Sequence, residues 1–337
     1  MRNLLVGMTL LLLSGLSTAS ETDADTSTPE TDDSGMEVVL VLGQQPGPGL
    51  WKVSSGDHVM WVLGEISPYP RKVKWVSKRF ESLLGNSQEL LLDYSGYWRA
   101  DHSDTRKLLI AEMLPPGVKL KDLISPELYR RFEATARRFD ATGLEELFPF
   151  AATNRLVVSA MDSMDMKAFS ARFTAAQLAR KAKLKITNFS APDLPFEDRL
   201  QNWRQPSNAV CLERLLGTIG DGGTGVRRLA NAWSVGDIPA LRQLVPVYSF
   251  SRDGFRSGEC AAAMHGGEKQ AAEYKRKRTQ LWLNQAKRAL KNNKRTMAVV
   301  PMSEIFASDG YLAALRAAGY EIEAPPEHKS VEGTRSD

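Results

Sequence analysis

The stretch of residues 273–324 constrains the fold of this chain more than any other part of the sequence. Residues 274–290 place apolar side chains near helical spacing, and a short apolar segment at 297–300 follows as a strand candidate. A second helical run at 311–318 precedes a strand-like segment at 320–323. This order of helix, strand, helix and strand predicts an α/β protein with a mostly parallel sheet flanked by helices.

Three acidic residues fall at the ends of predicted strands. Glu65, Asp93 and Glu304 lie at or just beyond the carboxyl ends of these strands, where open α/β sheets bind their ligands. If the strands are neighbours, the three carboxylates could bind a hard cation such as magnesium, calcium or manganese. The alternative, which we favour, is that Asp93 pairs with Arg278 while Glu65 and Glu304 face water.

One arginine stands on the apolar face of the first predicted helix. Arg278 lies four residues from both Tyr274 and Trp282, so all three share one face. A buried guanidinium needs an acidic or carbonyl partner. Arg278 therefore either lies along the apolar stripe with its charged end in water, or points at a carboxylate of a binding site.

The middle of the chain is expected to form a helical insertion. Residues 105–205 are mostly helical in pattern, with a further strand candidate at 156–158 and a connector at 193–203. Helices are also expected at 211–219 and 225–244.

The start of the sequence predicts export. Residues 1–19 combine Arg2, an apolar run and small residues suited to cleavage, which is typical of a secretory signal peptide. Residues 20–35 are acidic and almost free of apolar side chains, as in a disordered linker. We expect a folded domain at 36–325, a flexible tail at 326–337, and a periplasmic or secreted protein without a transmembrane segment in its mature chain.

Charge is distributed unevenly along the chain. Residues 1–35 hold one basic and six acidic residues, and the remainder holds 43 basic and 34 acidic residues. This excess favours an anionic partner such as an acidic polysaccharide or a lipid headgroup. The basic residues between Lys275 and Arg295 could bind such a polymer in a salt-dependent way, or they could form the solvated face of a helix, which we favour.

Two cysteines, Cys211 and Cys260, are expected to form a disulfide in an oxidising compartment; the alternative is two separate buried thiols. The sequence contains no His-Glu-x-x-His zinc signature and no Gly-x-Ser-x-Gly nucleophile motif. Common zinc-hydrolase and serine-hydrolase sites are therefore excluded at the level of motifs.

Five segments together resemble the TraB/GumN family, whose animal relatives are the Tiki-type proteases. Residues 60–67, Met-Trp-Val-Leu-Gly-Glu-Ile-Ser, are similar to the family strand that ends in Gly-x-x-His. Residues 90–93, Leu-Leu-Leu-Asp, resemble the next strand, which ends in an acid, and residues 230–237 contain the Ala-Trp-x-x-Gly-Asp pattern. Residues 278–282 are similar to Arg-Asn-x-x-Trp, and residues 297–305 to the strand that carries a second Gly-x-x-His.

The resemblance implies the fold: a mixed, mostly parallel sheet flanked by helices with a helical insertion, of the Tiki/EreA/ChaN-like type. The family's two histidines, its proposed metal ligands and catalytic residues, fall on Ser67 and Glu304 in this sequence. The asparagine after the motif arginine falls on Thr279, and the glycine of the second motif on Pro301. Four motif residues are kept, with the acid shortened to aspartate: Gly64, Asp93, Arg278 and Trp282.

Two hypotheses about function follow. The first is a non-catalytic binding or accessory protein of the bacterial envelope that needs no cofactor and binds an envelope protein, a peptide or an anionic polysaccharide, but no nucleic acid. The second is a peptidase-like, metal-dependent hydrolase with a rebuilt carboxylate site. There, Asp93 and Glu304 would serve as metal ligands or general base, and Arg278 would stabilise an oxyanion.

Overall fold

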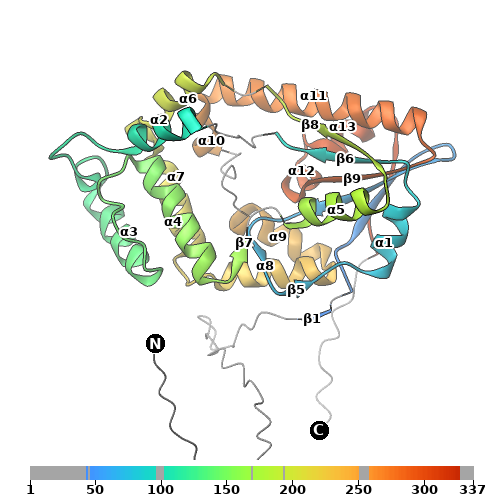
Figure 1. Ribbon diagram of the computed structural model, residues 1–337, viewed down its shortest axis with the longest axis horizontal. Helices are drawn as coiled ribbons and strands as arrows, with labels where there is room; N and C mark the ends of the chain where they lie inside the picture. The colour runs from blue at the N-terminus through green and yellow to red at the C-terminus, as the bar shows by residue number, and fades with distance from the viewer. Residues whose placement is uncertain are drawn as a thin grey trace, which may run out of the picture.

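The computed structural model describes residues 43–44, 46–95, 102–167, 170–192, 194–249 and 258–326 (Figure 1). The predicted signal peptide, the acidic linker and nearly all of the predicted tail lie outside these ranges, as do residues 36–42 of the expected folded domain. Within the described residues, no helix combines the length and apolarity needed to cross a bilayer.

A six-stranded mixed sheet forms the centre of the molecule, in the order β10-β2-β3-β9-β6-β8. The strands β3, β9, β6 and β8 are mutually parallel, whereas β2 runs antiparallel to its neighbours β3 and β10. The mostly parallel sheet predicted from the sequence is thus confirmed. Its strands are β2 (Leu50–Ser55), β3 (His58–Glu65), β6 (Glu89–Asp93), β8 (Lys185–Phe189), β9 (Arg295–Pro301) and β10 (Glu321–Glu323).

The parallel strands give the sheet two chemically different ends. At the carboxyl edge, β3, β6 and β9 end at Glu65, Asp93 and Pro301. At the opposite, amino edge, β6 and β9 begin at Glu89 and Arg295. In Figure 1 the carboxyl edge faces the helical part of the molecule.

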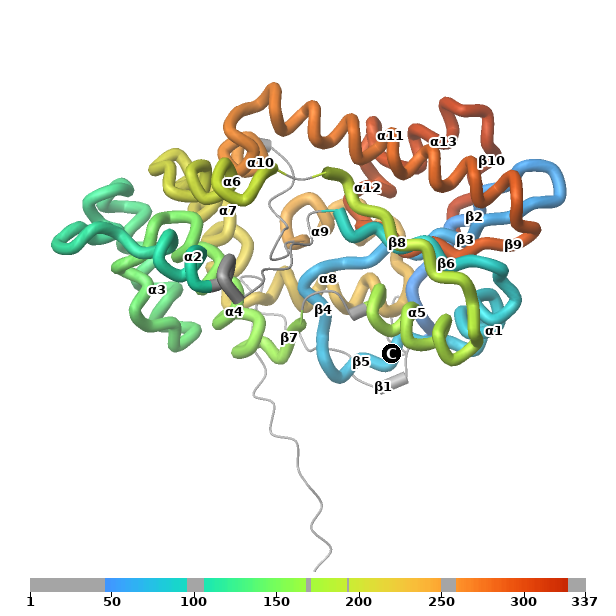
Figure 2. Tube along the Cα trace, turned by 45° about the horizontal axis from the view of Figure 1, so that its top comes forward, coloured from blue at the N-terminus to red at the C-terminus, as the bar shows by residue number. Residues whose placement is uncertain are grey.

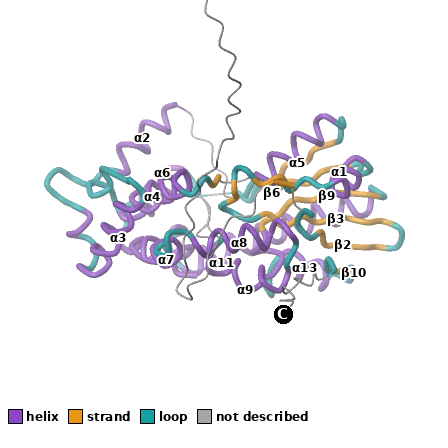
Figure 3. Tube along the Cα trace, turned by 90° about the horizontal axis from the view of Figure 1, so that it is seen from below, coloured by secondary structure: helices purple, strands orange, loops and turns teal. Residues whose placement is uncertain are grey.

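Helices cover both faces of the sheet. One face carries α1 (Lys78–Gly85) and α5 (Ser170–Lys181), and the other carries α11 (Glu268–Asn292) and α13 (Tyr311–Ala317), as Figures 2 and 3 show from two directions. Amphipathic patterning explains this placement, because α11 buries Trp282, Ala286 and Leu290 toward the strands. The strands between the layers are buried on both sides and therefore read as apolar runs.

The helical insertion packs beside the carboxyl edge (Figure 1). It comprises α2 (His102–Glu112), η1 (Leu120–Asp122), α3 (Pro126–Arg138), α4 (Pro149–Ser163), α6 (Phe196–Trp203), η2 (Pro206–Asn208), α7 (Ala209–Ile219) and α10 (Gly258–His265). Below the sheet lie α8 (Thr224–Val235) and α9 (Ile238–Tyr248), and α12 (Met302–Phe306) follows β9 directly. Two-residue pairings complete the fold: β1 (Gly43–Gln44) with β5 (Val73–Lys74), and β4 (Tyr69–Pro70) with β7 (Met166–Lys167).

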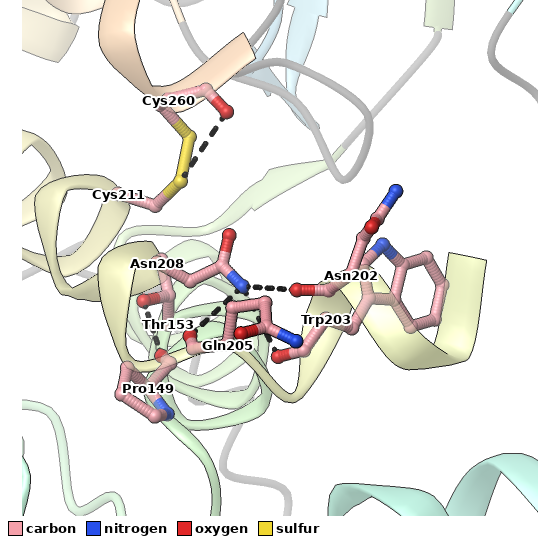
Figure 4. Close-up of a disulfide and its surroundings, with 8 residues drawn as sticks. All are labelled: Pro149, Thr153, Asn202, Trp203, Gln205, Asn208, Cys211 and Cys260. Carbon is pink, nitrogen blue, oxygen red and sulfur yellow. Dashed lines mark hydrogen bonds between the residues drawn. A yellow bond between two sulfur atoms is a disulfide. The ribbon is translucent and has the colours of Figure 1, made fainter. Parts of the chain in front are cut away.

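The predicted disulfide between Cys211 and Cys260 is present and joins α7 to α10, with Cα atoms 4.9 Å apart (Figure 4). Beside it, the buried Asn208 amide donates hydrogen bonds to the carbonyl groups of Asn202, Trp203 and Gln205 at 2.7, 3.2 and 3.1 Å. The covalent and polar links together fix α6, α7 and α10 against one another.

Three local predictions were wrong. Residues 156–158 belong to the 15-residue helix α4, whose buried side chains recur at helical spacing through Phe150, Thr153, Val157 and Ala160. The expected connector at 193–203 contains α6. The single helix expected at 225–244 is divided at Gly236, which adopts φ 74°, and α9 restarts there with an aspartate cap.

Candidate functional site

A buried arginine links the acidic residues at the carboxyl edge. Arg278 extends from α11, is 3% exposed, and donates from Nε to the Tyr311 hydroxyl oxygen at 2.7 Å. Its Nε lies 3.6 Å from Asp93 Oδ2, and its Nη2 lies 2.6 Å from Glu304 Oε1. Of the two interpretations offered by the sequence, the structure shows an arginine that points at site carboxylates.

Tyr311 connects Arg278 to Asp93. Its hydroxyl donates to Asp93 Oδ2 at 2.6 Å, and the backbone amide of Ser95 donates to Asp93 Oδ1 at 2.7 Å. Burial raises the pKa of Tyr311 well above its usual value, and Asp93 and Glu304 raise it further against the opposing effect of Arg278. The phenol therefore stays protonated and can donate to the aspartate.

The positive charge of Arg278 is permanent. Burial of the guanidinium opposes its charged form most strongly, but Tyr311, Glu304 and Asp93 together outweigh this and raise the pKa of Arg278. One cation thus serves two buried carboxylates, at 3.6 Å from Asp93 and 2.6 Å from Glu304.

Trp282, one helical turn beyond Arg278, positions Tyr311. The two rings stack with centroids 5.0 Å apart and an interplanar angle of 11°, and the indole Nε1 donates to the Tyr311 carbonyl at 3.3 Å. This explains why arginine and tryptophan occur four residues apart in the sequence: both contact the same tyrosine. The sequence analysis did not identify Tyr311 as a site residue. The only signal in the sequence was its position at the start of a predicted helix, directly after Gly310.

Glu65 belongs to a separate ion pair. Its Oε1 bonds to Nη2 of Arg172 on α5, and both residues are buried. The Arg172 guanidinium also lies over the Tyr94 ring, 5.0 Å from its centroid. Sequence reasoning missed Arg172, whose only signal was a charged residue within an otherwise alanine-rich helix.

The expectation that Glu65 and Glu304 face water was wrong, because their exposed fractions are 6% and 7%. Each carboxylate lies beside a buried guanidinium, which offsets the cost of removing its charge from water.

Gly64 allows α12 to pack directly on β3. A side-chain carbon at this position would lie 2.5 Å from Met302 Sδ and 2.8 Å from Ile305 Cδ1. The Gly64 carbonyl accepts a 2.6 Å hydrogen bond from the indole of Trp233, which comes from the Ala-Trp-x-x-Gly-Asp segment. The motif glycine therefore sets the position of the short helix that carries Glu304.

Four buried polar atoms at the carboxyl edge have no partner in hydrogen-bonding geometry among the described residues. They are Glu65 Oε2, Ser67 Oγ, Glu304 Oε2 and Arg278 Nη2; the 2.6 Å approach of Arg278 Nη2 to Glu304 Oε1 is an ion pair that lacks hydrogen-bond geometry. Buried polar groups in folded proteins are nearly always hydrogen-bonded, so four such atoms at one end of a sheet mark a region with unused bonding capacity. Three of them are acceptors or hydroxyls, and one is a cationic donor.

The residues at this edge do not fit the divalent metal that the family resemblance implies. No three His, Cys, Asp or Glu side chains in the described ranges are grouped so that they could hold a metal ion. Asp93 and Glu304 already share Arg278, and Glu65 is bound to Arg172. A guanidinium between two candidate ligands repels a second cation, and the imidazole ligands of a borderline metal centre are missing at these positions.

Comparison with known proteins agrees with this architecture. A model of the TraB/PrgY/gumN family matches residues 49–324, which is most of the chain. No curated protein and no solved structure gave a match.

Proposed function

Because the chain belongs to the TraB/PrgY/gumN family, we propose that it is a non-catalytic member that serves as a binding or accessory protein of the bacterial envelope. The observation that carries the proposal is the position of Arg278, whose guanidinium neutralises both Asp93 and Glu304. In the aligned motifs, Ser67 and Glu304 stand where the family has histidines. The proposal includes export, which is supported by the apolar N-terminal run and the acidic segment that follows it.

The ion pairs argue against catalysis by this site. A general base must present an oxygen that is free to take a proton, and in Glu304 one oxygen, Oε1, lies 2.6 Å from a permanent cation while the other, Oε2, is buried. Asp93 Oδ2 accepts the Tyr311 hydroxyl, and Asp93 Oδ1 accepts a backbone amide. These contacts occupy both oxygens of Asp93 and one oxygen of Glu304.

The remaining acceptors favour a ligand that donates hydrogen bonds. Glu65 Oε2, Glu304 Oε2 and Ser67 Oγ are buried and have no partner in the described part of the chain. Backbone amides of an extended peptide, or of an envelope protein segment, supply such donors at regular spacing. A peptide segment is the occupant that we propose, and its donors would have to reach acceptors that are closed to solvent in this structure.

The proposal is tested by measuring retained metal and peptide hydrolysis on the protein comprising residues 20–337. The protein is equilibrated with manganese, zinc, magnesium and calcium, dialysed, and analysed by elemental mass spectrometry, with Glu304→Ala in parallel. We expect no stoichiometric metal in either protein and no cleavage of a mixed peptide library. One equivalent retained by the wild type and lost in the variant, together with cleavage, would overturn the proposal.

A second candidate function, a hydrolase with a rebuilt carboxylate site, is favoured by one observation. Glu304 Oε2 and Arg278 Nη2 form an adjacent acceptor and donor, each without a hydrogen bond in the described ranges. Such a pair could orient water and stabilise an oxyanion. This candidate predicts that Glu304→Gln abolishes peptide cleavage while the thermal midpoint of unfolding stays near that of the wild type.

A further inference from the structure

The amino edge of the sheet carries a strip of exposed basic side chains, opposite the edge that holds Arg278. We define this amino-edge strip by six residues that come from the end of α5, the start of β8, the end of α11 and the start of β9. They are Lys181, Lys183, Lys185, Lys291, Lys294 and Arg295.

The contacts of Glu89 fix how these segments meet. Its Oε1 lies 3.3 Å from Lys185 Nζ and 2.8 Å from Arg288 Nη2, and its Oε2 accepts from Asn293 at 2.8 Å. The start of β8 and the last turn of α11 therefore meet at one carboxylate. Lys291 lies between Arg288 and Asn293 in that last turn, so the lysines of the two segments share one edge.

The strand register places the start of β8, which carries Lys185, two strands away from the start of β9, which carries Arg295. Glu89 pairs with Lys185 on one side and with Thr296, the neighbour of Arg295, on the other. Neighbouring strands lie about 4.8 Å apart, so the line from Lys185 to Thr296 crosses roughly 10 Å. Basic groups thus lie at the starts of β8 and β9 on one edge of the sheet, and the last turns of α5 and α11 add others from the two faces.

A purely structural explanation, like the solvated helix face favoured from the sequence for the basic residues between Lys275 and Arg295, covers part of the strip. Lys181 and Lys291 lie in the last turns of α5 and α11, where a positive charge complements the helix dipole. Lys183, Lys185 and Arg295 lie beyond those last turns, where the dipole effect has fallen off.

Lys183 supplies an independent observation. It adopts φ 56°, a left-handed conformation that follows the end of α5 and is normally taken by glycine or asparagine. A lysine at this position destabilises the fold relative to glycine, so a compensating role for its charge is expected. Within the strip, Lys185 pairs with Glu89 and Lys294 pairs with Asp57. In the described ranges, no ion pair is found for the other four members, Lys181, Lys183, Lys291 and Arg295.

The surroundings of the strip restrict the partner. Among the described residues, the exposed large hydrophobic side chains are Leu109, Ile110, Met113, Phe173 and Val247, and none belongs to the strip. Protein interfaces rely on aromatic and apolar anchors, and single-stranded nucleic acids stack on exposed rings. A nucleic-acid duplex presents one charge per about 1.7 Å of its axis, whereas the starts of β8 and β9 lie roughly 10 Å apart.

We propose that the amino-edge strip binds a linear acidic polysaccharide, whose carboxylates are spaced one sugar ring or more apart. Recognition rests on charge along an extended track and needs no deep pocket. The inference does not rest on the proposed function, because the strip lies at the opposite edge of the sheet from Arg278. A failure to bind polysaccharide would therefore count against this inference alone, and peptidase activity would count against the proposed function alone.

The test uses residues 20–337 and polygalacturonate of defined length, with neutral dextran as the comparison, followed by titration calorimetry. Lys183→Glu combined with Lys291→Glu is expected to weaken binding at low salt by at least about tenfold, because two cations become anions. The matched control is Lys121→Glu with Arg130→Glu, two exposed basic residues of η1 and α3 in the helical insertion, for which we expect less than about a threefold change. Figure 1 shows α3 at the end of the molecule away from the amino edge of the sheet.

A single substitution separates binding from folding. Lys183→Gly removes the charge and relieves the left-handed lysine, so it is expected to raise the thermal midpoint while it weakens polygalacturonate binding severalfold. Unchanged affinity in this variant and in the double variant would overturn the proposal, as would an equal loss in the control. Tighter binding to phosphatidylglycerol vesicles or to duplex DNA, lost in the same double variant, would overturn it in favour of those ligands.

Discussion

The five-residue strand β6 begins and ends with a buried acid, and the two acids have different environments. Glu89 at the amino edge is bonded through both oxygens: Arg288 approaches Oε1 at 2.8 Å and Oε2 at 3.2 Å, and Asn293 donates to Oε2 at 2.8 Å. Thr187 completes this set with a hydrogen bond to Oε1. Asp93 at the carboxyl edge shares its cation, Arg278, with a second carboxylate.

The two clusters differ in the number of buried polar atoms that have no hydrogen bond in the described ranges. In the Arg278 cluster, Nη2 of the arginine and Oε2 of Glu304 have no hydrogen bond among the described residues, whereas neither oxygen of Glu89 lacks one. A fully satisfied network serves the stability of the fold, and a partly satisfied one costs stability unless a ligand completes it. Similar residues at the two ends of one strand thus form one cluster whose hydrogen bonds are complete and one cluster in which some buried atoms have no hydrogen bond in the described part of the chain.

Removal of the arginine at the centre of each cluster is expected to give the largest difference in stability between the two clusters. Arg278→Ala leaves two buried carboxylates without their cation and is expected to lower the free energy of unfolding by about 3–5 kcal/mol. Arg288→Ala is the control, since Lys185 and Asn293 still contact Glu89, and should lower it by about 1–2 kcal/mol. Urea unfolding followed by tryptophan fluorescence gives both values. Equal losses in the two variants would remove the distinction between the clusters.

The pH dependence of stability should report on the Glu89 cluster. Burial favours the neutral acid, but hydrogen bonds from Arg288, Thr187 and Asn293 outweigh it and lower the pKa of Glu89 from 4.5 to about 2. A folded pKa below the unfolded one means that the carboxylate stabilises the protein above pH 4.5 and that this stability is lost as the pH falls from 4.5 to about 2.

The expected contribution is about 2–3 kcal/mol at neutral pH. The measurement is urea unfolding of the wild type and Glu89→Gln at several pH values. The wild type should be the more stable protein at pH 6, and the gap between the two should close toward pH 2.5. A gap that stays constant with pH would show that ionised Glu89 is no better accommodated than glutamine.

Deletion of one hydroxyl from each cluster gives the smallest and most direct comparison. Thr187→Val removes a donor to Glu89 and should lower the free energy of unfolding by about 1 kcal/mol. Ser67→Ala removes a buried oxygen that has no partner in the described part of the chain, so stability should stay within about 0.5 kcal/mol or rise. Thermal unfolding of the two variants decides the point. A larger loss for Ser67→Ala would mean that its hydroxyl is bonded in solution.

Sequence patterns found much of the carboxyl edge because the relevant signals are local. The spacing of four placed Arg278 and Trp282 on one helix face, and strand boundaries placed Asp93 and Glu304 at the end of the sheet. Strand β8 was missed because Lys-Ile-Thr-Asn-Phe is a half-exposed edge strand with little apolar signal.

The sequence by itself determined the mixed sheet, the disulfide pair and the residues that stand at the strand ends, since periodicity and motif order are written along the chain. Only the tertiary structure shows which side chains the acidic residues at the strand ends contact. Tyr311 is 218 residues from Asp93, and Arg172 is 107 residues from Glu65, and no local pattern links either pair. The packing of the helices on the sheet determines which side chain neutralises a buried charge. Burial itself arises only when distant segments of the chain come together.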